Sequence, residues 1–278
     1  GMQLLWFPGN YTVLDYQFPT SVSTLQARFA KYQGTTVQLA NITLDLPDRV
    51  PDREYRDELF GSMYSVAGVE STTAYSGIGF TALDSTLCQA YQGSVNCSEA
   101  WHRLWRAPAG YSVPLADLLR AGTVVVQNSL VDTRHVATPP GWHQVPADDA
   151  SGLVTVWARN TPLSAGRLSY ASAGVRVTGD AMVGQVGEDV SYQSAGSGEL
   201  TFARLAWPGY TATVNGQPAG VRSGPSGLLV VDLPAGVRSG QVSLSWSPPG
   251  SRVSAIAFAW GVLLAIGLAL SGRRWRRG

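Results

Sequence analysis

Carboxylates are the side chains of this 278-residue chain whose spacing first suggests chemistry. The segment 45–58 (DLPDRVPDREYRDE) carries six acidic residues and three arginines. Within it, Asp48, Asp52, Asp57 and Glu58 are the best candidates for a site that binds a cation or the hydroxyls of a sugar. A mixed charge run is more often a solvated loop. Both interpretations stay open at this point.

Two aromatic residues form a second candidate. Trp207 and Tyr210 flank a Pro-Gly turn, and aromatic rings that line a binding site can stack on the apolar faces of sugars. The alternative is that both rings pack inside a β-hairpin, because an aromatic residue beside Pro-Gly is more often buried.

The two cysteines, Cys88 and Cys97, are nine positions apart. In an oxidising compartment they could form a disulfide that closes a small loop, and two unpaired thiols are the alternative. His102, His135 and His143 are scattered, so the sequence predicts no zinc site, no other metal and no cofactor.

Signatures of an independent enzyme are missing from the sequence. No GxSxG is present, and the glycines of segment 60–82 do not form GxGxxG. A glycosidase needs two carboxylates about 5–10 Å apart, which sequence cannot test. The net charge of +1, without a basic cluster before the last six residues, argues against nucleic-acid binding. We therefore assign no catalytic residue to this chain.

Composition indicates a folded, turn-rich protein that must position these residues. Apolar residues make up 45%, charged residues 14%, and there are 31 Gly and 16 Pro. In region 1–150 we expect an α/β segment. Its expected helices and strands are 20–32, 98–105 and 114–120 (helical) and 36–39 and 123–127 (extended).

Region 151–250 is expected to be an antiparallel β-sandwich of the jelly-roll or carbohydrate-binding-module kind. Short strands recur between turns every 8–12 residues, as is typical of sandwiches. Asn215-Gly216 is the strongest hairpin signal. The expected strands are 153–158, 174–179, 199–205, 210–214, 228–233 and 241–246. The predicted fold class is α+β.

The C-terminal segment predicts a transmembrane helix over 253–272, a run of 20 residues without a charge. A buried core helix is the alternative. Arginines in the tail 273–278 place that tail in the cytoplasm and residues 1–252 outside the cell membrane. Because the chain begins without a signal peptide, we expect further membrane helices upstream of it.

The segment Trp207-Pro-Gly-Tyr-Thr-Ala-Thr-Val-Asn-Gly216 resembles the P-G-W-x-A-x-V-D-G motif of the YfhO-like bacterial membrane proteins, with Tyr210 and Asn215 in place of Trp and Asp. These proteins are polytopic glycosyltransferases of the GT-C type or their relatives. The order after the motif is also similar: Leu233-Pro-Ala-Gly236, then Val242-x-Leu-x-Trp-Ser-Pro248, then the apolar run. Looser likenesses lie at 68–75, 121–127 and 154–160.

The resemblance implies a function. The chain would be the extracytoplasmic C-terminal part of a glycosyltransferase that uses a polyprenyl-phosphate-sugar donor and a cell-envelope glycan acceptor. Its partners would be the lipid bilayer and envelope polysaccharide or a lipid-linked sugar. The family's catalytic acid lies among membrane helices that this chain lacks, so no position here inherits that role. The alternatives are a membrane-anchored glycan-binding module and a structural module that holds partner helices.

Overall fold

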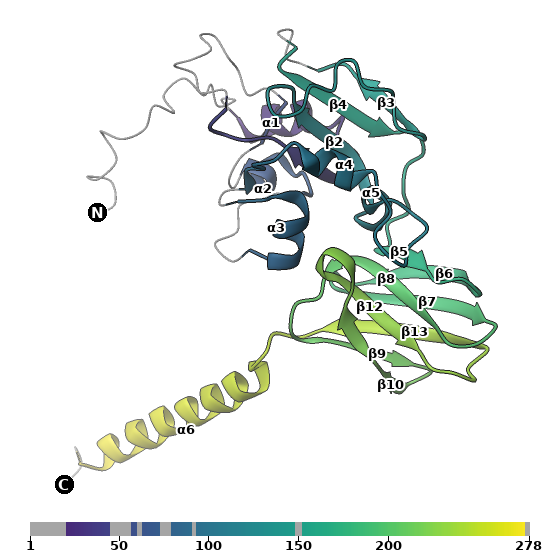
Figure 1. The fold of residues 1–278 in the computed structure, drawn as a ribbon. Helices are drawn as coiled ribbons and strands as arrows, with labels where there is room; N and C mark the ends of the chain where they lie inside the picture. The colour runs from purple at the N-terminus through teal and green to yellow at the C-terminus, as the bar shows by residue number, and fades with distance from the viewer. Residues whose placement is uncertain are drawn as a thin grey trace.

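A computed structural model of the protein describes residues 21–44, 57–59, 63–72, 79–90, 93–147 and 152–275, without the side chains at 252 and 269–275. The described residues form a mixed α+β protein in which most strand pairs are antiparallel. Figure 1 shows a helix-covered sheet next to a β-rich unit, from which one long helix projects.

The first sheet has the strand order β1-β2-β4-β3. Its strands are β1 (Thr35–Leu39), β2 (Ala121–Gln127), β3 (Trp142–Val145) and β4 (Val154–Arg159). β1 and β2 run parallel, and the other pairs are antiparallel. Every residue of β1 and β2 is buried. This explains why β2 reads as a continuous β-branched run, because a strand covered on both faces needs no polar alternation.

In the part of the chain that the structure describes, five short α-helices accompany this sheet. They are α1 (Val22–Phe29), α2 (Met63–Ala67), α3 (Thr81–Leu87), α4 (Glu99–Leu104) and α5 (Leu115–Leu118). Ser21 caps α1 by accepting a hydrogen bond from the backbone N–H of Thr24. The three expected helices are present with shorter bounds, and Pro114 is the N-cap of α5. α3, α4 and α5 bury Leu87, Leu104 and Leu118 in the core that they share with the sheet.

The β-rich unit contains two antiparallel sheets with the orders β10-β9-β13-β7-β6 and β11-β12-β8-β5. Both sheets contribute to one buried apolar cluster, which includes Tyr192, Phe202 and Val242. This is the layering of a β-sandwich. The elements are β5 (Leu168–Ala171), β6 (Val175–Val183), β7 (Gly187–Ser194), β8 (Gly198–Leu205), β9 (Tyr210–Val214), β10 (Gln217–Ala219), β11 (Val221–Ser223), η4 (Pro225–Gly227), β12 (Leu228–Leu233) and β13 (Ser239–Trp246).

The Asn215-Gly216 turn connects β9 and β10 as the sequence predicts. Asn215 has φ 51° and Gly216 has φ 80°. Two consecutive positive φ angles define the turn whose twist matches that of a hairpin, and Asn-Gly tolerates them best.

One strand lies in a different sheet from the one expected. The segment 153–158 was predicted to open the sandwich, but β4 pairs with β2 through Val156 opposite Val125. The first sheet therefore extends to Arg159, beyond the predicted boundary at residue 150. The run LVTVWA has the apolar character of any buried strand, and only its distant partner decides which sheet it joins.

Aromatic contacts join the two units. The Tyr111 hydroxyl lies 3.2 Å from the Thr201 hydroxyl of β8, and the Tyr111 ring packs on Tyr170 of β5 with centroids 4.8 Å apart. At the start of α3, Phe80 meets Trp207 edge to face at 4.9 Å. The first sheet and its helices thus rest on the sandwich through side chains and not only through the connecting segment.

α6 (Ser251–Trp275) follows β13 and projects away from the other elements (Figure 1). Its described side chains, at 251 and 253–268, are all exposed. Within the described residues, no helix has both the length and the apolarity needed to cross a membrane. A helix covers the expected range 253–272. A membrane span there is not supported by this finding and stays a prediction.

Candidate functional site

The acidic candidates do not form an open cluster in the described structure. Asp57 and Glu58 are fully buried, and the Asp57 carboxylate lies 2.6 Å from Nζ of Lys31, the only lysine of the chain. Asp48 and Asp52 lie outside the described residues. Across the described ranges, no three His, Cys, Asp or Glu side chains gather as a metal site requires. Asp57 is thus part of a buried ion pair.

The aromatic candidates pack against different partners. Trp207 is 38% exposed and holds its ring against Phe80. Tyr210, half-buried, faces Trp246 at a centroid distance of 6.4 Å. Both rings therefore have protein contacts on at least one side.

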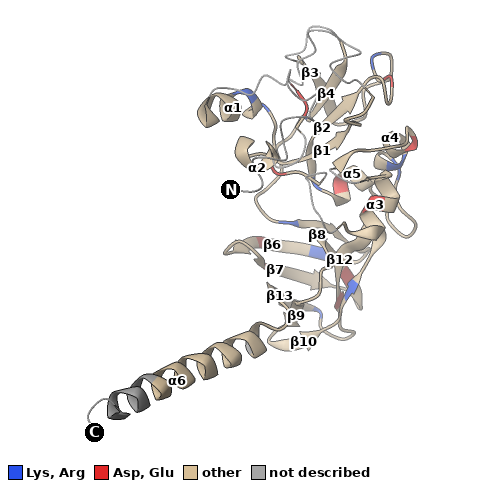
Figure 2. Cartoon of the chain, turned by 90° about the vertical axis from the view of Figure 1, so that its left-hand side faces the viewer, with Lys and Arg blue, Asp and Glu red and all other residues tan. Residues whose placement is uncertain are grey.

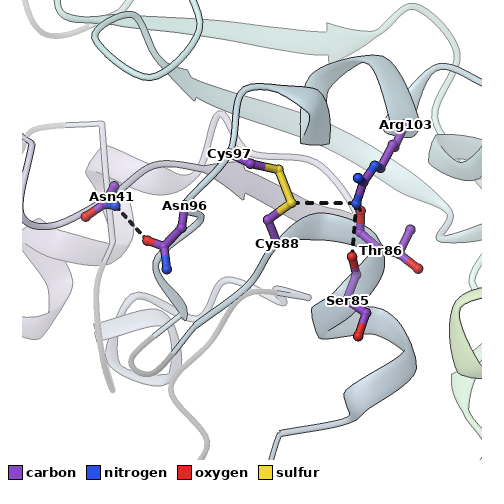
Figure 3. The surroundings of a disulfide bond; sticks show 7 residues. All are labelled: Asn41, Ser85, Thr86, Cys88, Asn96, Cys97 and Arg103. Carbon is purple, nitrogen blue, oxygen red and sulfur yellow. Dashed lines mark hydrogen bonds between the residues drawn. A yellow bond between two sulfur atoms is a disulfide. The ribbon is translucent and has the colours of Figure 1, made fainter.

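Cys88 and Cys97 are joined by a disulfide (Figure 3). Arg103 lies beside the bond and donates hydrogen bonds to the carbonyls of Ser85 and Thr86, at 3.0 and 3.1 Å. The bond therefore connects the end of α3 to the segment that begins α4, and its surroundings are those of a structural crosslink.

A polar cleft of about 260 Å³ lies where the first sheet meets the connecting segment that leads into the sandwich. The sequence did not point to it. Its lining combines guanidinium, hydroxyl, amide and carboxylate groups with backbone. The lining residues are Gln33, Gly34, Thr35, Glu70, Arg120, Gly122, Arg159, Thr161, Pro162, Leu163, Ser164, Ala165, Gly166 and Arg167.

Close backbone contact between the chains that enter β1 and β2 forms one wall of the cleft. A Cβ on Gly122 would lie 2.1 Å from the carbonyl oxygen of Gln33, so only glycine fits there. The Thr123 hydroxyl accepts from the Gln33 N–H at 2.8 Å and donates to its carbonyl at 3.1 Å. These contacts fix Gln33 at the edge of the cleft.

Arg120 fixes the opposite wall. Its guanidinium donates to the backbone carbonyls of Ser164 at 2.6 Å and Leu168 at 2.7 Å, and to the Ser164 hydroxyl at 3.0 Å. Burial lowers the pKa of Arg120, and the nearby acids Asp180 and Glu188 oppose that shift. No described carboxylate forms an ion pair with Arg120, so its charge is held mainly by carbonyl dipoles.

The other two arginines of the cleft are paired. Arg167 contacts Glu70 at 2.6 Å and donates to the Thr35 hydroxyl at 3.3 Å. Arg159 contacts Asp117 at 2.6 Å. The first pair joins the connecting segment to the region of the first sheet at the opening of the cleft, and the second holds Arg159 at the same opening.

A buried carboxylate supports the connecting segment from behind. Glu188 is fully buried and accepts hydrogen bonds from the backbone N–H groups of Arg167 at 2.6 Å and Leu168 at 2.7 Å. Burial, followed by a hydrogen bond with Asp180, raises the pKa of Glu188 to about 7. Arg204 lies 3.5 Å from its other oxygen. Protonation of Glu188 therefore affects the two hydrogen bonds that hold the backbone of Arg167 and Leu168 beside the cleft.

This arrangement is suited to binding a polar ligand. Glu70 is the one carboxylate among the described lining residues, whereas glycoside hydrolysis normally uses a pair. Sequence reasoning missed the cleft because its residues are far apart along the chain. Glu70 and Arg167 are separated by 97 positions. The available signal was the Pro- and Gly-containing stretch 161–166 between strands.

No protein-family model matches the chain, and comparisons with curated proteins and with solved structures give no match.

Proposed function

We propose that this chain is the extracytoplasmic C-terminal part of a polytopic membrane glycosyltransferase, non-catalytic by itself, and that its polar cleft binds the cell-envelope glycan acceptor. The observation that carries the proposal is a cleft of about 260 Å³ whose walls offer hydroxyl, amide and guanidinium groups with a single carboxylate. The volume suits one sugar residue of a longer chain, which would extend into solvent.

Sugar hydroxyls both donate and accept hydrogen bonds, and the lining supplies both kinds of partner. Thr35 and Ser164 offer hydroxyls, and Gln33 offers an amide. Arg120 adds a cation without a paired carboxylate among the described residues. A glycan that carries a carboxylate or phosphate group would therefore bind more tightly than a neutral one, because charge-assisted hydrogen bonds are the stronger ones.

The membrane half of the proposal rests on the sequence together with α6. The apolar run 253–272 is followed by arginines, and every described side chain of α6 is exposed. α6 carries Arg252 at its start and Arg273 and Arg274 near its end, and the 20 residues between them hold no charge. In Figure 2 the tan part of this helix accordingly shows neither blue nor red. We place α6 in the cell membrane, with residues 1–252 outside and the tail 273–278 in the cytoplasm. The sugar donor would be handled by membrane helices upstream of this chain, as the YfhO-like resemblance implies.

A titration of the detergent-solubilised full chain tests binding. The probes are galactose, glucuronic acid and oligosaccharides of each, followed by NMR shift changes. Leu163→Trp fills the mouth of the cleft, and Val136→Trp is the matched control because Leu163 and Val136 are 38% and 39% exposed. We expect saturable binding, stronger for the acidic series, that Leu163→Trp weakens about tenfold and the control leaves unchanged.

Two outcomes would refute the glycan site. One is the absence of saturable binding by any probe at the highest soluble concentration. The other is binding that Leu163→Trp leaves intact. The first outcome would favour a module that only holds partner helices.

A further inference from the structure

The exposed apolar side chains of the sandwich are confined to two places. Between Leu168 and Trp246, the exposed large apolar residues are Val183 at 53%, Val186 at 42% and Trp207 at 38%. We call these three residues the apolar rim. Isolated exposed apolar residues are common on soluble domains, but exposed apolar residues that gather at one end of a domain can mark an interaction surface.

Strand register brings the rim to one end of the sandwich. Val183 pairs with Gly187 across the turn after β6, and Glu188 pairs with Leu244 of β13. This turn therefore lies next to the last residues of β13. On the other side of β13, Trp246 pairs with Tyr210.

The loop that carries Trp207 is fastened to the same point. Trp246 Nε1 donates to the Pro208 carbonyl at 3.0 Å, and the Ser247 N–H donates to the Gly209 carbonyl at 3.1 Å. α6 begins at Ser251, four residues after Ser247. The rim therefore surrounds the place where α6 leaves the sandwich.

The opposite end of the sandwich is charged. There Arg222 lies in contact with Glu199 and 3.0 Å from Asp232. Glu199 and Asp232 pair across β8 and β12, one position from the end of β12 at Leu233. The two ends of one sandwich thus differ in chemistry, with exposed large apolar side chains only where the apolar helix emerges.

We propose that the apolar rim contacts the headgroup and acyl boundary of the same bilayer that holds α6, so that the sandwich stands on the membrane through Val183, Val186 and Trp207. This rests on the membrane placement of α6 proposed above. Tryptophan favours this boundary because its ring is amphipathic. The rim lies beside the segment that leads into α6, and the described side chains of α6 are all exposed, which favours lipid over a protein partner as the occupant of the rim.

A fluorescence experiment on the full chain tests the contact. Val186→Cys and Ser197→Cys each receive an environment-sensitive NBD label. Ser197 is an exposed residue in the turn after β7, at the far end of that strand. Cys88 and Cys97 are bonded to each other, so the new thiol is the reactive one. A third label at Leu264→Cys, in α6, reports insertion into the bilayer.

The labelled proteins are reconstituted into vesicles of phosphatidylcholine and phosphatidylglycerol that contain nitroxide-labelled lipid. We expect strong quenching at position 264, and at position 186 quenching about twofold or more above that at 197, with blue-shifted emission at 186. An unquenched label at 264 would overturn the membrane placement itself. Quenching at 264 with equal, weak quenching at 186 and 197 would overturn only the rim contact. Quenching at 186 that Trp207→Ser with Val183→Ser leaves unchanged would also overturn it.

Discussion

The polar cleft and the apolar rim are built in opposite ways. The cleft gathers Arg120, Arg159 and Arg167 into a half-open space and holds them with carbonyls and carboxylates. The rim leaves two valines exposed at the β6–β7 turn and a tryptophan exposed in the loop before β9. A soluble protein usually keeps charge outside and apolar groups inside. Where this chain departs from that rule, we have proposed a ligand for the cleft and a membrane contact for the rim.

The two regions should also differ in how strongly a substitution changes the free energy of unfolding. The cleft is part of the joint between the units, so its residues act on folding as well as on binding. In the rim, Trp207 also packs on Phe80, whereas Val183 and Val186 are mostly exposed, so the two valines act mainly on what lies outside the molecule. The following variants separate the two regions by the size of their effect on unfolding.

The largest effect is expected for Arg120→Ala. This change removes the donors to the carbonyls of Ser164 and Leu168, and partly buried carbonyls without donors cost about 2–4 kcal/mol together. Denaturant unfolding should show that loss. Arg134→Ala, which breaks an exposed pair with Asp132, is the control and should leave the midpoint unchanged. An equal response of both variants would mean that the cleft is not part of the joint.

Removal of the disulfide by Cys88→Ser with Cys97→Ser should rank second. The bond closes a loop between residues nine positions apart, and its loss should cost about 2–3 kcal/mol by the chain-entropy estimate. Because neither cysteine lines the cleft or belongs to the rim, sugar binding and lipid quenching at a temperature where the variant is folded should be unaltered. A change in either property would link this crosslink to function.

An effect of intermediate size is expected from pH at Glu188. Its pKa is raised from 4.5 to about 7, so folding favours the protonated form. Its contribution to stability is fully present below pH 4.5 and is lost as pH rises through about 7, on the order of 1–3 kcal/mol. In thermal unfolding between pH 5 and 8, Glu188→Gln should flatten this dependence. Glu99→Gln, at an exposed carboxyl of α4, should retain it. A Glu188→Gln profile parallel to that of the unmodified chain would contradict the assignment.

The smallest effect belongs to the rim. Val183→Asn with Val186→Asn should change the free energy of unfolding by less than about 0.5 kcal/mol, because both side chains are more than two-fifths exposed. The same variant, labelled at Trp207→Cys, should show weaker quenching by lipid-borne nitroxide than the same label on the chain with both valines. A large destabilisation would show instead that these valines belong to the sandwich core.

The sequence was most informative where structure is local. Asn215-Gly216 predicted its hairpin because the turn depends on those two residues alone. The apolar run predicted the α6 helix, and the spacing of Cys88 and Cys97 allowed the loop that their bond closes. The two layers of the sandwich followed from repeated short strands between turns.

The sequence was least informative where contacting residues are far apart along the chain. Residues 153–158 belong to the first sheet because they pair with β2. The alternation of apolar residues along a strand does not reveal which strand is its partner. Asp57 lies in a segment whose mixed charges are typical of a solvated loop, but it pairs with Lys31, which is 26 positions away. The cleft joins Thr35 to Arg167 across 132 positions. β7, with the polar sequence GEDVSYQS, pairs into the sandwich despite its weak strand signal.

The central claim is that the cleft beside Arg120 receives the glycan while the rim does not. Hydrogen–deuterium exchange of the full chain in lipid nanodiscs, with and without a saturating acidic oligosaccharide, tests it most directly. We predict slower exchange in 33–35 and 161–167 and no change in 207–210. Slower exchange confined to 207–210, with 161–167 unaffected, would contradict the claim and transfer the sugar site to Trp207 and Tyr210.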